Sequence, residues 1–201
     1  MLERRNAAAR AFDELSSFTS TILIETGQGV VRRSVSYSKP GSWRVEDGDG
    51  LLLLRTPDIH LKRGPEGTLQ RLPQKRWWPD EEIGYLGWGH PDFLLGATLI
   101  RSDEALTTHR ATGREVRSEL FDMQGKRCAL ETDSALGILL SQSTDGVYSA
   151  TVTDLDVESM LASHCFDAAE FSDLAPVEVE DEDRHQLKAV NGPEGTLFWS
   201  T

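Results

Sequence analysis

Hydrophobic and polar positions alternate along much of the chain, most clearly at residues 112–141. The first part of this segment alternates Val116, Ser118 and Leu120 with charged side chains, which is the period of two expected for a strand with one buried face. Two polar turns that contain glycine separate it from two further apolar segments. The predicted antiparallel meander has strands at residues 114–121, 127–132 and 138–141, joined by turns at residues 122–125 and 133–137.

Similar segments, separated by turns rich in glycine and proline, predict further strands on either side of this meander. Residues 51–54 are consecutive leucines, which is typical of a strand buried on both faces. We interpret Asp47 and Asp49 as hairpin residues, because their spacing lacks the remaining oxygen ligands of a calcium loop. The further predicted strands are residues 19–25, 30–38, 43–46, 51–55, 59–63, 68–72, 147–155 and 196–200.

Helical periodicity is clearest at residues 2–15. Apolar residues there, Phe12 among them, recur at a spacing of three or four, and Phe18 follows one turn later. A proline opens a short predicted helix at residues 91–99, because proline is favoured in the first turn. Residues 157–162 are expected to form a helical turn.

Three runs of sequence carry a family resemblance: VSYSKPGSWRVE at residues 35–46, TGREVRSEL at residues 112–120 and LETDSALGILL at residues 130–140. They resemble the LolA/LppX-like lipoprotein-carrier fold, and more closely an uncharacterised bacterial branch related to outer-membrane lipoprotein sorting. The resemblance covers roughly residues 1–171. Its motifs are strands and turns without a reactive side chain, so it indicates a fold more than a function.

The resemblance and the strand pattern together imply an α+β fold. We expect a strongly curved antiparallel sheet, a half-barrel of about nine to eleven strands, that wraps the N-terminal helix. Residues 1–171 are expected to form this curved-sheet domain. Residues 172–201 are expected to be an acidic C-terminal extension that carries the late strand.

Aromatic residues gather between residues 73 and 96, in a segment broken by glycines and prolines. Two interpretations of this segment remain open. Either it covers the mouth of an apolar hollow in the curved sheet, or its aromatic side chains hold an irregular loop on the core. In the first case the hollow is a ligand site, and its candidate lining residues are Phe12, Trp43, Trp77, Trp78, Trp88 and Phe93.

The formal net charge of −12 argues against nucleic-acid binding, which needs clustered Lys and Arg, and disfavours anionic membrane surfaces. Acidic side chains crowd residues 167–183, either as a solvated segment or as a site for a cation or a basic partner. No stretch of about 18 apolar residues predicts a transmembrane segment. The first ten residues lack a continuous apolar stretch, so we expect no signal peptide and a cytoplasmic location, or export if the N-terminus is truncated.

The sequence contains no recognisable catalytic or metal-binding motif. The five histidines form no metal-binding pair, and the two cysteines, Cys128 and Cys165, have no CxxC spacing. Whether these cysteines pair is left open. His164 precedes Cys165 directly, but adjacent residues on a strand point to opposite faces. We therefore predict a protein that is not an enzyme and has no metal or cofactor.

Two functions from different classes fit these observations. The first is a binding module whose apolar concavity takes a lipid or another hydrophobic small molecule. The second is a cytoplasmic protein-interaction or regulatory module of the same fold, in which the chain's own side chains fill the core. In that case the acidic C-terminal segment or a sheet edge contacts a protein partner. We expect a monomer or a homodimer in either case.

Overall fold

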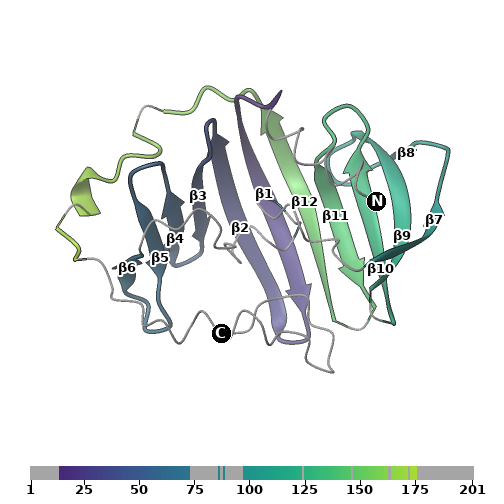
Figure 1. Cartoon of the computed structure of the whole chain (residues 1–201), viewed down its shortest axis with the longest axis horizontal. Helices are drawn as coiled ribbons and strands as arrows, with labels where there is room; N and C mark the ends of the chain where they lie inside the picture. Colours follow the sequence, from purple (N-terminus) through teal and green to yellow (C-terminus); the bar gives the residue numbers. More distant parts are fainter. Residues whose placement is uncertain are drawn as a thin grey trace.

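The chain forms a twelve-stranded antiparallel sheet in a computed structural model (Figure 1). The structure describes residues 14–72, 97–123, 125–145, 147–162, 164–171 and 173–175, together with Leu86 and Trp88. The strands are β1 (Ser17–Thr26), β2 (Gly29–Ser38), β3 (Ser42–Asp47), β4 (Gly50–Arg55), β5 (His60–Arg63), β6 (Leu69–Arg71), β7 (Thr98–Ser102), β8 (Thr107–Thr108), β9 (Glu115–Met123), β10 (Lys126–Asp133), β11 (Leu139–Thr144) and β12 (Tyr148–Val157).

Two meanders meet in the middle of this sheet. The strand order is β6-β5-β4-β3-β2-β1-β12-β11-β10-β9-β7, and β8 pairs with β9. Strand β1 is joined to β2 by a tight turn and to β12 by a long-range ladder, in which Phe18 faces Val157 and Thr26 faces Tyr148. The β1–β12 ladder therefore connects the first third of the chain to its last described strand.

The α+β class predicted from the sequence is wrong for the described part of the chain, which is nearly all antiparallel sheet. Its helical residues are Glu14 and those of η1 (Ala169–Phe171), a short 3₁₀ turn. Most of the expected N-terminal helix falls on residues 1–13, which lie outside the described residues. Phe18 lies in β1 instead, where β-branched neighbours favour a strand.

The other two predicted helical segments need the same correction. Residues 91–96 lie outside the described residues, but Leu99, at the end of the expected helix, pairs with Phe121 in the sheet. Residues 157–162 form no helical turn: Ser17 Oγ donates to Ser159 O at 2.9 Å, and Ser159 Oγ donates to Asp156 O at 2.7 Å. These bonds tie the segment after β12 to the start of β1 in a non-helical conformation.

The sheet also has more strands than the nine to eleven expected. The two strands without a counterpart in the sequence-based prediction are β7 and β8. Four of the five residues of β7 are exposed and β8 has two residues, so neither shows the alternation of a half-buried strand. All the other described strands coincide, to within three residues at each end, with those expected from the pattern.

One face of the sheet, called the core face below, carries the main hydrophobic core. Alternation places the side chains: in β3, Trp43 and Val45 are buried, whereas Arg44 and Glu46, which alternate with them, are half-buried on the other side. Leu86 and Trp88 belong to the same core. Its largest fully buried members are Trp88, Phe18, Phe121, Ile22, Ile24, Leu53, Leu86, Leu130 and Ile138.

The opposite face, called the outer face below, has its own smaller core over β4 and β5. Leu53 belongs to the main core, whereas Leu54 packs with Ile59 and Leu61 on the outer face. Phe166 and Phe171, from the segment after β12, pack against this second cluster. The expectation that the leucine run forms a strand buried on both faces is therefore confirmed.

The predicted domain boundary at residue 171 stays a prediction. Leu174, just beyond it, packs against the outer-face cluster. The predicted late strand at residues 196–200 lies outside the described residues. Among the helices of the described part, none has the length and apolar content to span a bilayer.

Candidate functional site

The most distinctive feature of the core face is a cluster of four aromatic side chains. Phe18 of β1 faces Tyr37 of β2 in the register, and Tyr37 in turn faces Trp43 of β3. These residues form one cross-strand row because the turns at residues 27–28 and 39–41 fix the pairing of the strands. Trp88 completes the cluster from outside the sheet.

The four rings pack directly on one another. Phe18 stacks on Tyr37 with centroids 5.3 Å apart and meets Trp43 edge-on at 6.0 Å. Trp88 makes a second edge-on contact with Phe18 at 5.3 Å, and its indole N–H donates to Leu139 O at 3.1 Å. Aromatic pairs in this geometry contribute about 0.5–1.5 kcal/mol each beyond burial, so the cluster holds β1, β2, β3 and β11 together.

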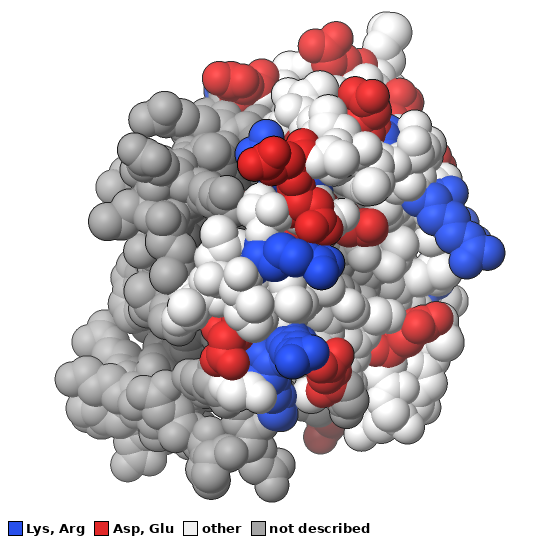
Figure 2. Space-filling view, turned by 90° about the vertical axis from the view of Figure 1, so that its right-hand side faces the viewer, with Lys and Arg blue, Asp and Glu red and all other residues white. Residues whose placement is uncertain are grey.

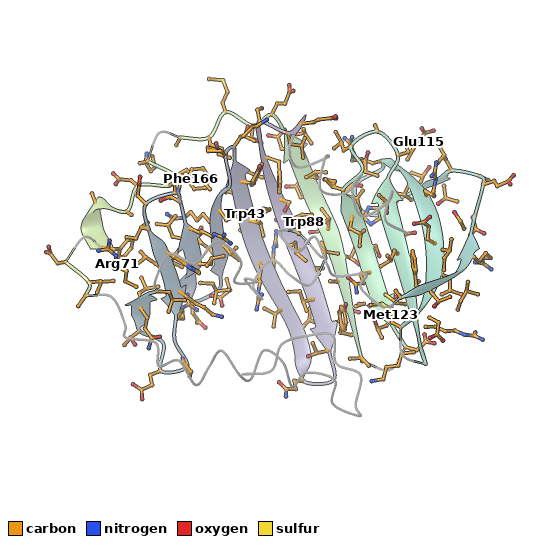
Figure 3. The ribbon with its side chains drawn as sticks, viewed as in Figure 1. Trp43, Arg71, Trp88, Glu115, Met123 and Phe166 are labelled. Carbon is orange, nitrogen blue, oxygen red and sulfur yellow. The ribbon has the colours of Figure 1, made fainter. Side chains whose placement is uncertain are left out.

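Two of the six predicted lining residues lie together in this cluster. Trp43 and Trp88 are 5% and 1% exposed and both contact Phe18; Figure 3 labels both over the middle of the sheet. Their role in ligand binding stays a prediction. The other four, Phe12, Trp77, Trp78 and Phe93, lie outside the described residues.

Sequence reasoning missed the other two members, Phe18 and Tyr37. The apolar pattern places Phe18 at the end of a helical periodicity, and it does not single out Tyr37 as a site residue. The signal was present in the tight turns. Once β1, β2 and β3 are drawn as consecutive hairpins, positions 18, 37 and 43 fall opposite one another.

Basic and imidazole groups continue the aromatic row towards β5. Trp43 faces Arg55 of β4, and Arg55 faces His60 of β5, which is 3% exposed. Lys62 faces Leu53 one row further along. The aromatic cluster is thus bordered by polar, basic side chains on one side of the core face.

The β3–β4 hairpin confirms the structural role predicted for its aspartates. Asp47 Oδ1 accepts hydrogen bonds from the Asp49 N–H at 2.8 Å and from Arg63 Nη1 at 3.0 Å. Burial acts to raise the pKa of Asp47, but these bonds and the charges of Arg63 and Arg33 outweigh it and lower that pKa. Within the described ranges, no three His, Cys, Asp or Glu side chains gather as a metal site.

A second polar group interrupts the core face between β10 and β12. Cys128, Thr144 and Tyr148 follow one another across the strands, and Gln142 lies on the same face one row along. Gln142 Nε2 donates to Cys128 Sγ at 3.6 Å. Burial raises the pKa of the Cys128 thiol, partly offset by its hydrogen bonds with Thr144 and Gln142.

A third polar cluster ties the turns at residues 109–114 and 133–138 to each other. His109 Nδ1 lies 2.9 Å from Thr112 Oγ1, and His109 Nε2 lies 3.8 Å from a carboxylate oxygen of Glu131. Asp133 is 2% exposed and pairs with Arg114. Burial lowers the pKa of His109, opposed by the nearby carboxylates of Glu131 and Asp133.

The third cluster places the Thr112 hydroxyl beside the imidazole of His109, which is only 2% exposed. His164 is exposed and Cys165 half-buried on the segment that crosses the outer face, where the Cys165 carbonyl accepts from Arg44 Nη1 at 3.1 Å. Both cysteines are free thiols. Figure 2 faces the β7–β9 end of the sheet, where acidic and basic side chains are interspersed rather than separated by sign.

Several solved structures share this fold. The chain is similar to one in the MucA/MucB complex of Pseudomonas aeruginosa, with a TM-score of 0.58, 16% identity and coverage of 88% of this chain and 63% of that one. A structure of MucB with MucA(peri) gives a TM-score of 0.55 at 16% identity, covering 88% and 62%. The lipoprotein LppX of Mycobacterium tuberculosis gives 0.46 at 11% identity, covering 80% and 96%.

The similarity to the MucA/MucB chains confirms the LolA/LppX-like fold inferred from the three sequence motifs. At such low identities it establishes the fold alone. The chain spans less than two thirds of the length of the MucA/MucB chains that it matches. No family model matches the sequence, and no curated protein matches it.

Proposed function

We propose that the protein is a non-catalytic binding protein that holds a lipid or another hydrophobic ligand against the core face of its sheet. The observation that carries this proposal is the aromatic cluster of Phe18, Tyr37, Trp43 and Trp88. Apolar and aromatic walls with a few polar groups are typical of small-ligand sites. The shared fold with lipoprotein-carrier proteins supports the same proposal.

The physical basis of binding would be burial of an apolar chain. Each methylene removed from water contributes about 0.8 kcal/mol, so a long acyl chain can be held without any charged contact. The basic border formed by Arg55, His60 and Lys62 marks where apolar contact ends. No covalent step is required of any side chain on this face.

A direct test is native mass spectrometry of the protein purified from its own host, combined with titration of the fluorescent probe N-phenyl-1-naphthylamine. We expect an added mass of a few hundred daltons that is lost on denaturation, and saturable probe binding. Trp43→Leu should weaken probe binding several-fold by removing aromatic contact, whereas Met160→Leu, at a fully exposed residue, should not. Absence of both bound mass and saturable probe binding would refute the proposal.

A second candidate function is recognition of a protein partner through a sheet edge. Strand β7 is the last strand on its side of the sheet, and Leu99 and Ile100 on it are 39% and 52% exposed. Exposed apolar edge strands are sites where a partner strand can add. The similarity to a chain from the MucA/MucB complex supports this alternative.

This alternative makes a different experimental prediction. A partner recovered with the wild-type chain should be lost with Ile100→Asp, while bound lipid and probe affinity stay unchanged. The acidic C-terminal segment is the other proposed contact, and removing residues 176–201 should then reduce recovery of the same partner. If neither change reduces recovery of the partner, both surfaces are excluded as its binding site.

A further inference from the structure

Gln142 is a buried polar side chain in an otherwise apolar part of the core face. It is 2% exposed, and its partners in the register are Leu130 of β10 and Ala150 of β12, both members of the main core. Its neighbours along β11, Ser141 and Ser143, are on the opposite side of the strand by alternation. The amide is therefore held on the face that we assign to the ligand.

The nitrogen of this amide has a hydrogen-bond partner among the described residues, and its oxygen has none. Nε2 donates to Cys128 Sγ at 3.6 Å, a weak contact for a nitrogen donor. Oε1 is fully buried and accepts no hydrogen bond from any side chain or backbone group of the described residues. Buried polar atoms are almost always hydrogen-bonded in folded proteins, so this acceptor calls for a donor beyond the described residues.

A second orphan lies on the same face. Ser20 of β1 is 6% exposed, and its Oγ also has no partner among the described residues. Ser20 faces Val35 on one side and Leu155 on the other. Two unsatisfied polar atoms on one apolar face indicate that the occupant of this face carries hydrogen-bonding groups as well as apolar surface.

We propose that Gln142 Oε1 accepts a hydrogen bond from the bound ligand, which is therefore an amphipathic molecule with a hydroxyl or amide N–H donor. The donor lies beside β10, β11 and β12, and the apolar chain runs towards the aromatic cluster. Gln142 lies in the row of Ile24, six residues along β1 from Phe18, which is about 20 Å at the rise of a strand. A long acyl chain can span that length and pass Ser20 on the way.

This inference rests on the proposed function. A matched pair of ligands distinguishes failure of the inference from failure of the proposed function. N-methyldodecanamide has one N–H donor, whereas N,N-dimethyldodecanamide has none and is otherwise alike. Titration calorimetry of the full chain should show that wild type prefers the N-methyl amide by about tenfold, the worth of one net hydrogen bond. Gln142→Leu should abolish the preference by weakening only the N-methyl amide.

The control substitution is Gln28→Leu, the same change at an exposed turn residue, and it should keep the wild-type preference. Leucine removes an unsatisfied buried acceptor at similar volume, so we expect Gln142→Leu to fold. The preference of the wild type is itself a test that needs no variant. If both amides bind equally to wild type, or the preference survives in Gln142→Leu, Gln142 does not accept a hydrogen bond from the ligand and the inference fails alone. If neither amide binds to wild type, the proposed function fails with it.

Discussion

Replacing Asp133 should unfold the protein at a markedly lower denaturant concentration. Asp133 opens the turn between β10 and β11, and its side chain is 1% exposed. Oδ1 accepts the backbone N–H groups of Ala135 at 2.9 Å and Leu136 at 2.7 Å, and Oδ2 accepts from Arg114 Nε. One carboxylate therefore shapes its own turn and anchors a side chain from the start of β9.

The expected loss follows from these contacts. In Asp133→Ala the two N–H groups lose a charged acceptor, a loss of about 1 kcal/mol each because both lie near solvent. Arg114 is one-third exposed, so its ion pair contributes about 0–1 kcal/mol after screening by solvent. The sum is about 2–3 kcal/mol. Asp133→Asn keeps Oδ1 as an acceptor and loses the charge, so we expect about half of that effect.

Urea unfolding followed by circular dichroism measures both variants. Asp154→Ala, at an exposed position of β12, is the matched control and should change the free energy of unfolding by less than about 0.5 kcal/mol. An Asp133→Ala variant as stable as this control would refute the reasoning. Equal losses in the alanine and asparagine variants would show that the charge, rather than the turn geometry, stabilises this site.

Three further predictions concern other parts of the molecule. Phe166→Ala should lower the free energy of unfolding by about 1–2 kcal/mol, because the ring packs on the outer-face cluster, whereas Met160→Ala, at a fully exposed residue, should have no effect in the same urea assay. The lowered pKa of His109 means that the unfolded chain binds this proton more readily. The free energy of unfolding should therefore fall as pH drops below about 6.5, and His109→Asn should flatten that dependence in urea titrations at several pH values. Cys165 should react with Ellman's reagent in the native protein, whereas buried Cys128, whose pKa is raised, should react only after unfolding; equal rates would contradict its burial.

The strands could be predicted from the sequence because local rules and the fold agree there. Val116, Ser118 and Leu120 alternate as expected in β9, and Gly125 occupies a positive φ of 83° in the following turn. The class was mispredicted where an apolar periodicity is ambiguous. Phe18 fits a helical spacing from Phe12, yet its β-branched neighbours and its pairing with Tyr37 and Val157 place it in the sheet.

The candidate site was less predictable because it depends on pairing between distant strands. Trp43 and Trp88 were identified from their aromatic character alone, whereas their common contact with Phe18 needs the register of the sheet. Gln142 gave no signal at all in the sequence. A polar residue between two serines resembles a solvated strand position, and only the β10–β11–β12 ladder shows that it faces the core.

The two faces of the sheet differ in how well their polar groups are satisfied, and this difference favours one face for the proposed ligand. Over β4 and β5 the outer face is already covered, because Phe166 and Phe171 pack on Leu54 and Leu61 and Arg44 holds the carbonyl of Cys165. That segment satisfies its own contacts and leaves no orphan polar group on Arg44 or Glu46, which pair with each other at 2.7 Å. The unsatisfied atoms of Ser20 and Gln142 lie on the other side of the sheet, between apolar neighbours. A buried acceptor without a hydrogen-bond donor costs free energy, so the ligand that we propose would gain most on the core face.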